Sequence, residues 1–289
     1  MRFVMFADTS PESVFAPSWI LRFFRRLSFR RKLGVGELIW SRTLTSRRTT
    51  WVDFGNLKWK LNLANDTHRW LVYGEYEEPG VRRLLECVLE AKSVVIDSGA
   101  NIGQMVLMVL RCGPPAMIHA FEPTPEARSW LEECVAGNEL GNVIVSPLAL
   151  GAGAGTANLV EHDFHHKEGA QNRLTASGDG LSIEVITLDA YAEAHGIEHV
   201  RFWKLDMEGY ELSALRGAQA LLQHAAIDYI YVETGSAGEA IAEYLTQFGY
   251  IAVPLGIGRV LSRAEVRARF TNVFVSDRVA REECCLATD

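Results

Sequence analysis

The chain has 289 residues, of which 48% are hydrophobic and 22% are charged, and its formal net charge at pH 7 is −7. This is the composition of an ordinary soluble globular protein, with room for one large domain or for a domain and a small appendage. No apolar run reaches the roughly 18 residues that a membrane span needs, which excludes a membrane-spanning helix.

The first residues, MRFVMFADTSPES, do not resemble a signal peptide, because their apolar stretch is short and Asp8 comes early. The five cysteines include no CxxC pair. A chain of this size needs no disulfide to fold. We therefore expect a cytoplasmic protein with reduced thiols.

Charge is distributed unevenly along the chain. Residues 1–50 hold ten Lys and Arg against three acidic residues, a net charge of +7, so residues 51–289 carry −14. An acidic body argues against general binding of nucleic acid. The basic N-terminal segment calls for a separate explanation.

Residues 18–33, SWILRFFRRLSFRRKL, predict one amphipathic helix. One face would hold the apolar residues and the other the arginines, namely Trp19, Ile20, Phe23, Phe24 and Leu27 against Arg22, Arg25 and Arg26. This pattern is typical of a helix that binds a membrane surface, an acidic partner or a second subunit. It also fits a helix that packs on the body with its arginines in water, which we favour because nothing else indicates lipid.

The next segment, WVDFGNLKWKLNL at residues 51–63, predicts a β-hairpin with its turn around Gly55 and Asn56. We expect residues 1–72 to form a basic N-terminal extension of helix and hairpin, and residues 73–289 to form the main domain.

From about residue 80 the pattern alternates between strands and helices. Expected strands lie at 94–97, 117–122, 142–150, 202–208, 228–234, 250–255 and 271–276, and expected helices at 81–91, 102–110, 125–138, 211–223 and 238–249. A further strand followed by a helix is expected within residues 182–195. Such alternation predicts an α/β fold with a mainly parallel central sheet.

The stretch VVIDSGANIG, residues 94–103, is the strongest local indication of a ligand. Gly99 would let backbone approach a ligand, and Gly103 would let the next helix pack near the sheet. A nicotinamide fold would read GxGxxG here, but Asn101 replaces the glycine that makes room for a pyrophosphate. Glu122 ends the next strand, where an acid grips ribose hydroxyls. The pattern favours a nucleoside without pyrophosphate; a packed structural turn is the alternative.

At these residues the sequence resembles a known family. IDSGANIGQ, AFEPTPEA, NVIVSPLALG, ITLD, KLDMEGYELSALRGA and YVET follow in the order seen in the FkbM family of S-adenosylmethionine-dependent methyltransferases. The resemblance covers roughly residues 73–253. Ser98 departs from it, because a small apolar residue is commoner there.

The resemblance implies a class I methyltransferase (Rossmann-like) fold, with a seven-stranded, mostly parallel sheet, a reversed last strand and helices on both faces. It also implies S-adenosylmethionine as cofactor, S-adenosylhomocysteine as product, and a small acceptor with a hydroxyl, either a sugar or a natural product. The residues implied to contact the cofactor are Asp97, Gly99, Asn101, Glu122, Pro123, Ala149 and Asp206.

The segment FWKLDMEGYE, residues 202–211, places three charges at the end of an expected core strand. Alternation in an extended chain would point Lys204, Asp206 and Glu208 the same way. A carboxylate can withdraw the proton of a hydroxyl, and an ammonium can stabilise the developing alkoxide or orient the acceptor. A buried ion-pair network is the alternative. Glu233, at the end of another strand, is a further candidate with the same two interpretations.

The loop EHDFHHKEGAQNR, residues 161–173, contains His162, His165 and His166, but their spacing fits no common zinc site. We expect a lid over the acceptor or a plain polar loop. Asp206 and Glu208 could chelate a divalent ion, although the sequence does not favour one.

Two other functions remain open. A methyltransferase of this fold could transfer the methyl group to an amine, or the chain could be a nucleoside-binding module without catalysis. The inward charges at 204, 206 and 208 argue against the second, because buried charges are costly to keep.

Overall fold

The computed structural model describes residues 14–27, 29, 31–76, 79–160, 173–175, 180–233, 237–253 and 271–282. The chain divides into two compact units, Met1–Glu78 with Glu132–Leu140, and Pro79–Leu131 with Gly141–Asp289. Each unit is described by itself. The predicted division into 1–72 and 73–289 stays a prediction.

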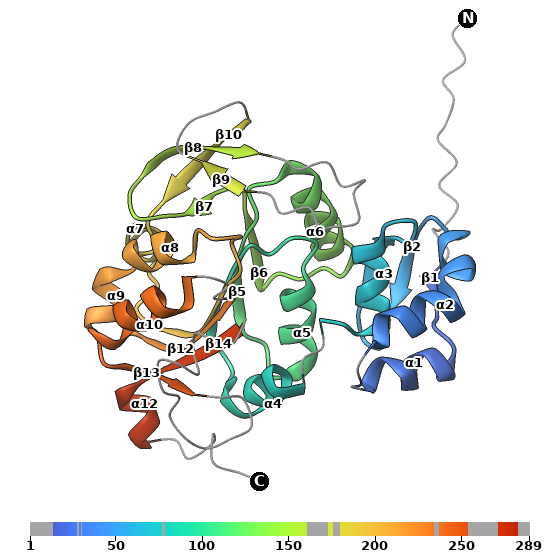
Figure 1. Ribbon diagram of the computed structural model, residues 1–289, viewed down its shortest axis with the longest axis horizontal. Helices are drawn as coiled ribbons and strands as arrows, with labels where there is room; N and C mark the ends of the chain where they lie inside the picture. Colours follow the sequence, from blue (N-terminus) through green and yellow to red (C-terminus); the bar gives the residue numbers. More distant parts are fainter. Residues whose placement is uncertain are drawn as a thin grey trace, which may run out of the picture. The chain divides into compact units, whose positions relative to one another are not determined.

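The described part of the first unit contains a small sheet and helices of its own (Figure 1). Its strands, in the order β1-β2-β3, are Val14–Phe15, Thr49–Asp53 and Lys58–Asn62. Its helices are α1 (Trp19–Arg26), α2 (Lys32–Thr45) and α3 (Asp66–Tyr73). Strands β2 and β3 are antiparallel, with Gly55 at a φ of 102° in the turn, so the predicted hairpin is confirmed.

The prediction of one helix over residues 18–33 was wrong. Helix α1 ends at Arg26 because Leu27 is extended, and Arg31 is left-handed, with a φ of 66°, immediately before α2. The ammonium of Lys32 donates to the carbonyl oxygen of Arg25 at 2.9 Å. The break therefore brings the start of α2 back onto the end of α1.

The predicted faces of α1 were also wrong. The buried residues are Leu21, Phe24 and Arg25, whereas Trp19 and Phe23 are exposed. The packed surface of α1 is thus rotated away from the stripe that the pattern indicated, and it includes one of the arginines expected in water.

The second unit is built on a seven-stranded sheet in the order β13-β14-β12-β11-β4-β5-β6 (Figure 1). The strands are β4 (Val94–Ser98), β5 (Met117–Phe121), β6 (Val143–Ser146), β11 (Val200–Leu205), β12 (Ile227–Glu233), β13 (Tyr250–Val253) and β14 (Thr271–Ser276). Strands β6, β5, β4, β11 and β12 are parallel, and β14 runs antiparallel to both of its neighbours. The class I methyltransferase fold, with one reversed strand, is confirmed.

Helices cover both faces of this sheet (Figure 1). They are α4 (Pro79–Val88), α5 (Gln104–Cys112), α6 (Pro125–Gly137), α7 (Leu188–His195), α8 (Glu211–Arg216), α9 (Gln219–Gln223) and α10 (Gly238–Thr246), with α12 (Asp277–Glu282) after the last strand. Trp203 and Ile230 of the sheet pack in one buried cluster with Leu188, Leu215 and Ile241 from α7, α8 and α10.

Helix α6 belongs to both units, since its residues up to Leu131 are in the second unit and those from Glu132 are in the first. Within the first unit, Cys134 is wholly buried, and its sulfur accepts a hydrogen bond from the backbone N–H of Lys60 at 3.1 Å. Gly137 lies so close to the Trp51 ring that an added Cβ would be 2.2 Å from it. The second half of α6 is therefore a packed part of the first unit.

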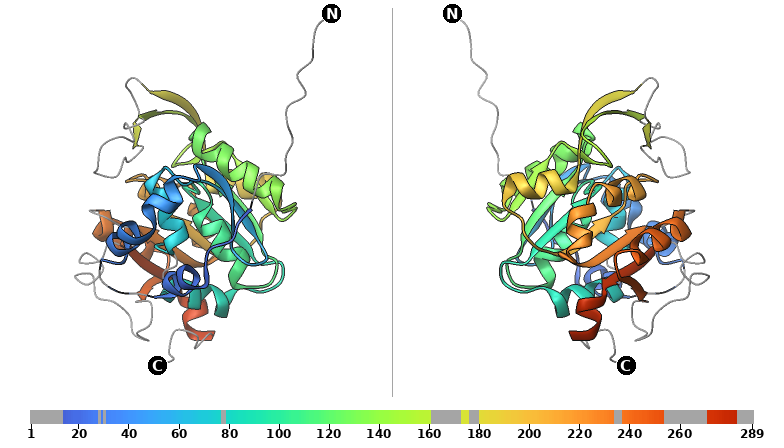
Figure 2. Two further views of the ribbon diagram at one scale, coloured as in Figure 1. Left: turned by 90° about the vertical axis from the view of Figure 1, so that its right-hand side faces the viewer. Right: turned by 90° about the vertical axis from the view of Figure 1, so that its left-hand side faces the viewer.

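Two predicted elements are interrupted in the structure. The expected strand 142–150 splits into β6 and β7 (Ala149–Leu150) around Pro147, which has no N–H for a ladder. Strand β7 instead begins a second sheet, β7-β10-β8-β9, with β8 (Gly155–Val160), β9 (Arg173–Thr175) and β10 (Leu181–Ile186) (Figure 2). The expected helix 211–223 breaks at Gly217, where a Cβ would lie 2.0 Å from the carbonyl oxygen of Gly151.

Ser98, the departure from the family pattern, has a specific partner. Its hydroxyl accepts a hydrogen bond from the indole Nε1 of Trp203 at 2.8 Å, and both residues are wholly buried.

We expect Ser98→Ala to lower the free energy of unfolding by about 1–3 kcal/mol, because it would leave the buried indole N–H unpaired. Urea denaturation measures this loss. Ser98→Thr, which keeps the hydroxyl, is the control for the hydrogen bond. A Ser98→Ala protein as stable as the parent would show that the bond contributes nothing.

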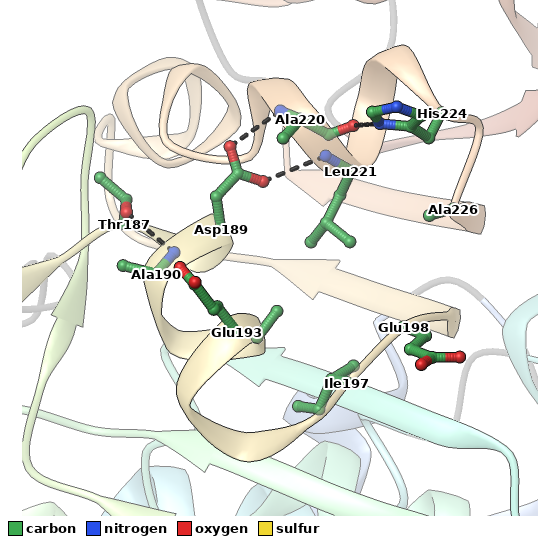
Figure 3. Close-up of a pocket in the computed structure, with 11 residues that line it drawn as sticks. Thr187, Asp189, Ala190, Glu193, Ile197, Glu198, Ala220, Leu221, His224 and Ala226 are labelled. Atoms are coloured by element: carbon green, nitrogen blue, oxygen red, sulfur yellow. Dashed lines mark hydrogen bonds between the residues drawn. The ribbon is translucent and has the colours of Figure 1, made fainter.

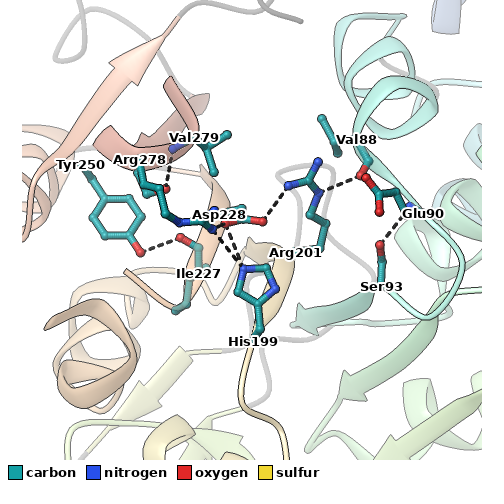
Figure 4. A network of polar contacts seen from close by, with 11 residues as sticks. Val88, Glu90, Ser93, His199, Arg201, Ile227, Asp228, Tyr250, Arg278 and Val279 are labelled. Carbon is teal, nitrogen blue, oxygen red and sulfur yellow. Dashed lines mark hydrogen bonds and ion pairs between the residues drawn. The ribbon is translucent and has the colours of Figure 1, made fainter. Parts of the chain in front are cut away.

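A charged cluster lies at the amino ends of β11 and β12 (Figure 4). The wholly buried carboxylate of Asp228 contacts Arg201 at 2.7 Å, His199 at 3.0 Å, and Arg278. Burial opposes ionisation of Asp228, but hydrogen bonds from His199 and Arg201 outweigh it and lower its pKa. These side chains fasten α12 to the edge of the sheet opposite the carboxyl ends of the strands.

No helix among the described residues has the length and hydropathy needed to cross a membrane.

Candidate active site

The predicted site residues follow the carboxyl ends of neighbouring strands. Strands β4, β11 and β12 are adjacent and parallel, so their last residues, Ser98, Leu205 and Glu233, lie at one edge of the sheet. This is the edge where open α/β sheets bind ligands. Lys204 of β11 is in register with Asp97 of β4, which places the two side chains next to each other.

Lys204 links the two strands through its ammonium group. Its Nζ donates to the carbonyl oxygen of Gly99 at 2.8 Å, and it lies 3.2 Å from Oδ2 of Asp206 and 3.4 Å from Oδ1 of Asp97. Burial works against the charge, but the two carboxylates outweigh it and raise the pKa of Lys204. The ammonium is therefore charged at every physiological pH, with one hydrogen bond to Gly99 and ion pairs to the two carboxylates.

Asp97 lies beneath this ammonium. Its side chain is wholly buried, and neither carboxylate oxygen makes a hydrogen bond within the described part of the chain. Burial, opposed by Lys204, raises the pKa of Asp97. The group is thus an acceptor with unused capacity at the end of β4.

The turn after β4 packs directly on the end of β11. Gly99 has a φ of 77°, and a Cβ on it would lie 1.8 Å from the carbonyl oxygen of Asp206. We had expected Gly99 to give a ligand room, but the atom that approaches it most closely belongs to Asp206. Asn101 is also left-handed, with a φ of 51°, and its Oδ1 accepts from the N–H of Ile102 at 2.8 Å.

Glu122, at the end of β5, is held by backbone donors. Its Oε2 accepts from the N–H of Asn101 at 2.7 Å, and its Oε1 accepts from the N–H of Thr124 at 2.8 Å. Burial raises its pKa, and the hydrogen bonds from Thr124 and Asn101 act against that rise. Glu122 thereby fixes the left-handed turn after β4.

The prediction that Lys204, Asp206 and Glu208 alternate along one strand was wrong beyond Leu205. Strand β11 ends there, and Glu208 adopts a left-handed φ of 52° in the turn that follows. The three charges nevertheless interact, because both Asp206 and Lys204 change the pKa of Glu208.

Three carboxyl groups meet at this edge, on Asp206, Glu208 and Glu233. Burial opposes ionisation of Asp206, but the charge of Lys204 and a hydrogen bond with Glu233 lower its pKa. Burial, the same hydrogen bond and repulsion by Asp206 raise the pKa of Glu233 to about 9. At neutral pH the pair therefore holds one proton, with Asp206 ionised and Glu233 as the donor.

The pKa of Glu208 lies between those of Asp206 and Glu233. Glu208 is exposed in the turn, and its partial desolvation, followed by repulsion from Asp206 and Glu211, raises its pKa to about 7. A carboxyl group with this pKa changes charge in the range where a general base is most effective.

Glu211 is a site residue that sequence reasoning missed. It is buried in the first turn of α8, and its Oε1 accepts from the backbone N–H of Met207 at 2.8 Å and of Gly209 at 3.0 Å. The carboxylate thus fixes the turn that carries Glu208. An acid two residues after a glycine, at the start of a helix, was the available indication.

The remaining predicted residues lie beside this arrangement or outside it. Pro123 is half-buried directly after Glu122, and its carbonyl oxygen accepts from Arg128 at 3.1 Å. Ala149 is buried in β7, opposite Val185 of β10. The histidines of the loop 161–172 lie outside the described residues. Within those residues, no group of three or more His, Cys, Asp or Glu side chains could hold a metal ion.

A hollow of about 630 Å³ between α7 and α9 contains none of the predicted site residues (Figure 3). Its central acid, Asp189, accepts from the backbone N–H groups of Ala220 at 2.8 Å and Leu221 at 3.1 Å. The carboxylate of Asp189 thus caps the start of α9. We therefore place the candidate site at the carboxyl ends of the strands and not in this hollow.

The strand order and the glycine turn followed by an acid define a class I methyltransferase. The model of the Methyltransferase FkbM domain matches residues 97–252, more than half of the chain. The chain belongs to this family of FkbM methyltransferases.

Three curated proteins are similar to the chain, including the following two. Hexuronic acid methyltransferase AglP of Haloferax volcanii is 26% identical over 164 residues, which cover 57% of this chain and 65% of AglP. Methyltransferase sdnD of Sordaria araneosa is 26% identical over 159 residues, which cover 45% of this chain and 61% of sdnD. The chain thus spans less than two-thirds of the length of each relative.

Among solved structures, an rRNA methylase from Streptococcus thermophilus is similar over 68% of this chain and 93% of its own, with a TM-score of 0.39 and 13% identity. A likeness of this size carries no conclusion about activity or substrate.

Proposed function

We propose that the chain is an S-adenosylmethionine-dependent O-methyltransferase that acts on a hydroxyl group of a sugar or natural product. The observation that carries the proposal is the group of three carboxyls at the carboxyl edge, one of which, Glu208, has a pKa of about 7. A hydroxyl is a poor nucleophile until its proton is withdrawn, and a carboxylate within reach can withdraw it.

The residues after β4 and β5 fit such a cofactor. The buried oxygens of Asp97 have unused capacity for a donor such as an ammonium group, and Glu122 directly follows β5, at the position where an acid binds ribose. Asp97, Gly99, Asn101 and Glu122 would hold the cofactor. When bound, it would supply an activated methyl group.

In this proposal, different residues of the chain withdraw the proton, position the neighbouring groups and adjust the pKa of the base. Glu208 takes the proton from the acceptor. Lys204 is a positioning residue, because its ammonium group already contacts Gly99, Asp97 and Asp206. Asp206 and Glu233 hold one shared proton, which keeps a negative charge beside Glu208 and raises its pKa.

The pH dependence follows from this assignment. Glu208 must be ionised to accept a proton, so kcat/KM is expected to rise as the pH increases through about 7. Asp206→Asn removes a repelling charge and should move this rise to lower pH, but not to the value of an ordinary Glu because partial desolvation remains. Initial rates across the pH range in both proteins measure the shift. An unchanged midpoint in Asp206→Asn would contradict the coupling.

The function itself is tested by binding and by a screen of acceptors. Calorimetry with S-adenosylhomocysteine should show binding, and binding of NAD alone would overturn the proposal. A labelled donor is then offered with hexuronic acid glycosides, neutral sugars, hydroxylated natural products and primary amines, and mass spectrometry detects the addition of one methyl group. The glycosides are included because AglP is named for hexuronic acid. Methylation of amines only would favour the N-methyltransferase alternative.

A further inference from the structure

Helices α1 and α2 present large apolar side chains to solvent. On α1, Trp19 is 77% exposed and Phe23 is 60% exposed; on α2, Leu38 is 86% exposed. Exposed apolar residues are ordinary when they are scattered singly. These are gathered on two helices, and each helix repeats them at helical spacing, so they form stripes.

The stripe of α1 runs through Trp19, Ile20 and Phe23 and is followed by exposed Leu27 just after the helix, and that of α2 runs through Val35, Leu38 and Ile39. Residues three and four apart share one face of a helix. We call these seven residues the apolar stripes.

The two helices lie next to each other (Figure 1), and the residues of both stripes are exposed. The ring of Phe24 on α1 is 4.8 Å from that of Trp40 on α2, and 6.4 Å from that of Tyr73 on α3. Gly36 of α2 also packs on Tyr73, at a distance of 3.0 Å for an added Cβ. The inner faces of both helices are thus used within the first unit, and the apolar stripes lie on the sides turned away from Tyr73.

Positive charge accompanies the apolar stripes. Arg26, Arg31 and Arg42 are exposed at the helix ends. Between Glu12 and Asp53 the sequence has a single acid, Glu37, which is ion-paired with Arg69 at 3.0 Å. Aromatic and aliphatic residues bordered by arginines are the composition of surfaces that lie in the headgroup layer of a bilayer. Anionic lipids attract such basic segments.

We propose that the apolar stripes dock on an anionic lipid surface, with Arg26, Arg31 and Arg42 at the headgroups. A partner bound by charge alone, such as the acidic surface of a second copy, would leave the exposed side chains of Trp19 and Leu38 without apolar contacts. The lipid interior accepts the apolar side chains and the headgroups accept the charges. This inference does not depend on the proposed function.

Flotation of the full chain with vesicles tests the proposal. We expect the protein to float with vesicles of phosphatidylcholine and phosphatidylglycerol, and less with phosphatidylcholine alone. Trp19→Ser combined with Leu38→Ser should weaken binding by about tenfold or more, because two large side chains no longer enter the bilayer. Ile144→Ser, at an exposed apolar residue of β6 in the second unit, is the matched control and should bind as the parent does.

A second variant separates charge from apolar contact. Arg26→Glu combined with Arg42→Glu should remove the preference for anionic vesicles, and added salt should weaken binding of the parent. Circular dichroism and binding of S-adenosylhomocysteine confirm that each variant is folded. The proposal is overturned if the parent does not float, or if the Trp19/Leu38 variant floats as the parent does. A concentration-dependent dimer that this variant abolishes, without any flotation, would assign the apolar stripes to a second copy and would also overturn it.

Discussion

Glu208→Gln is expected to lower kcat for methyl transfer by about 10²–10⁴, the usual contribution of a general base. The amide keeps the size and the left-handed backbone of Glu208 but cannot accept the proton. Binding of S-adenosylhomocysteine should be unchanged, because the proposed cofactor residues lie after β4 and β5. Single-turnover rates and calorimetry measure the two effects separately.

The matched control for this variant is Glu198→Gln, an exposed glutamate just before β11, at the opposite edge of the sheet. It should have the parent's rate. If Glu208→Gln retained near-normal turnover with the rise in kcat/KM still near pH 7, the proton would have to be withdrawn by another group. The Asp206–Glu233 pair would then be the next candidate, tested by Glu233→Gln.

Gly99→Ala is expected to lower the free energy of unfolding by about 3 kcal/mol or more, since it combines backbone strain with a steric clash. The φ of 77° disfavours any side chain, and the new Cβ would lie 1.8 Å from the carbonyl oxygen of Asp206. The turn after β4 and the end of β11 would have to separate. Urea denaturation gives the loss, and binding of S-adenosylhomocysteine should weaken in parallel.

Gly209→Ala isolates the two contributions. Gly209 also has a positive φ, of 94°, but no atom lies within 4 Å of its added Cβ. It should therefore cost only about 1–2 kcal/mol, the cost of a left-handed backbone alone. Equal losses in the two variants would show that contact with Asp206 does not contribute.

The sequence was informative wherever local rules decide the outcome. Strand-forming runs and helical periodicity in residues 94–150 correctly predicted the alternation of strands and helices, and Gly55 correctly predicted the hairpin turn. The motif after Asp97 and the acid at Glu122 were correctly placed at strand ends that lie side by side. These features depend on the residue itself and on its neighbours in the chain.

Where packing between distant segments decides, sequence reasoning failed. The buried face of α1 is set by Tyr73 and Lys32, which no helical period reveals. The position of Glu208 depends on Glu211, whose carboxylate holds the backbone of the turn, so the rule of strand alternation was extended too far. The shared proton of Asp206 and Glu233 joins residues 27 positions apart and follows from the pairing of β11 with β12.

The membership of α6 in both units limits how this protein can be dissected. Removing residues 1–78 would remove the packing partners of Cys134 and Gly137. The surface of the second half of α6 that these partners cover would then be exposed to solvent. A trimmed catalytic fragment would inherit this surface and a tendency to aggregate. The described part of residues 14–76 thus covers the second half of α6 and should be kept in any shortened version of the protein.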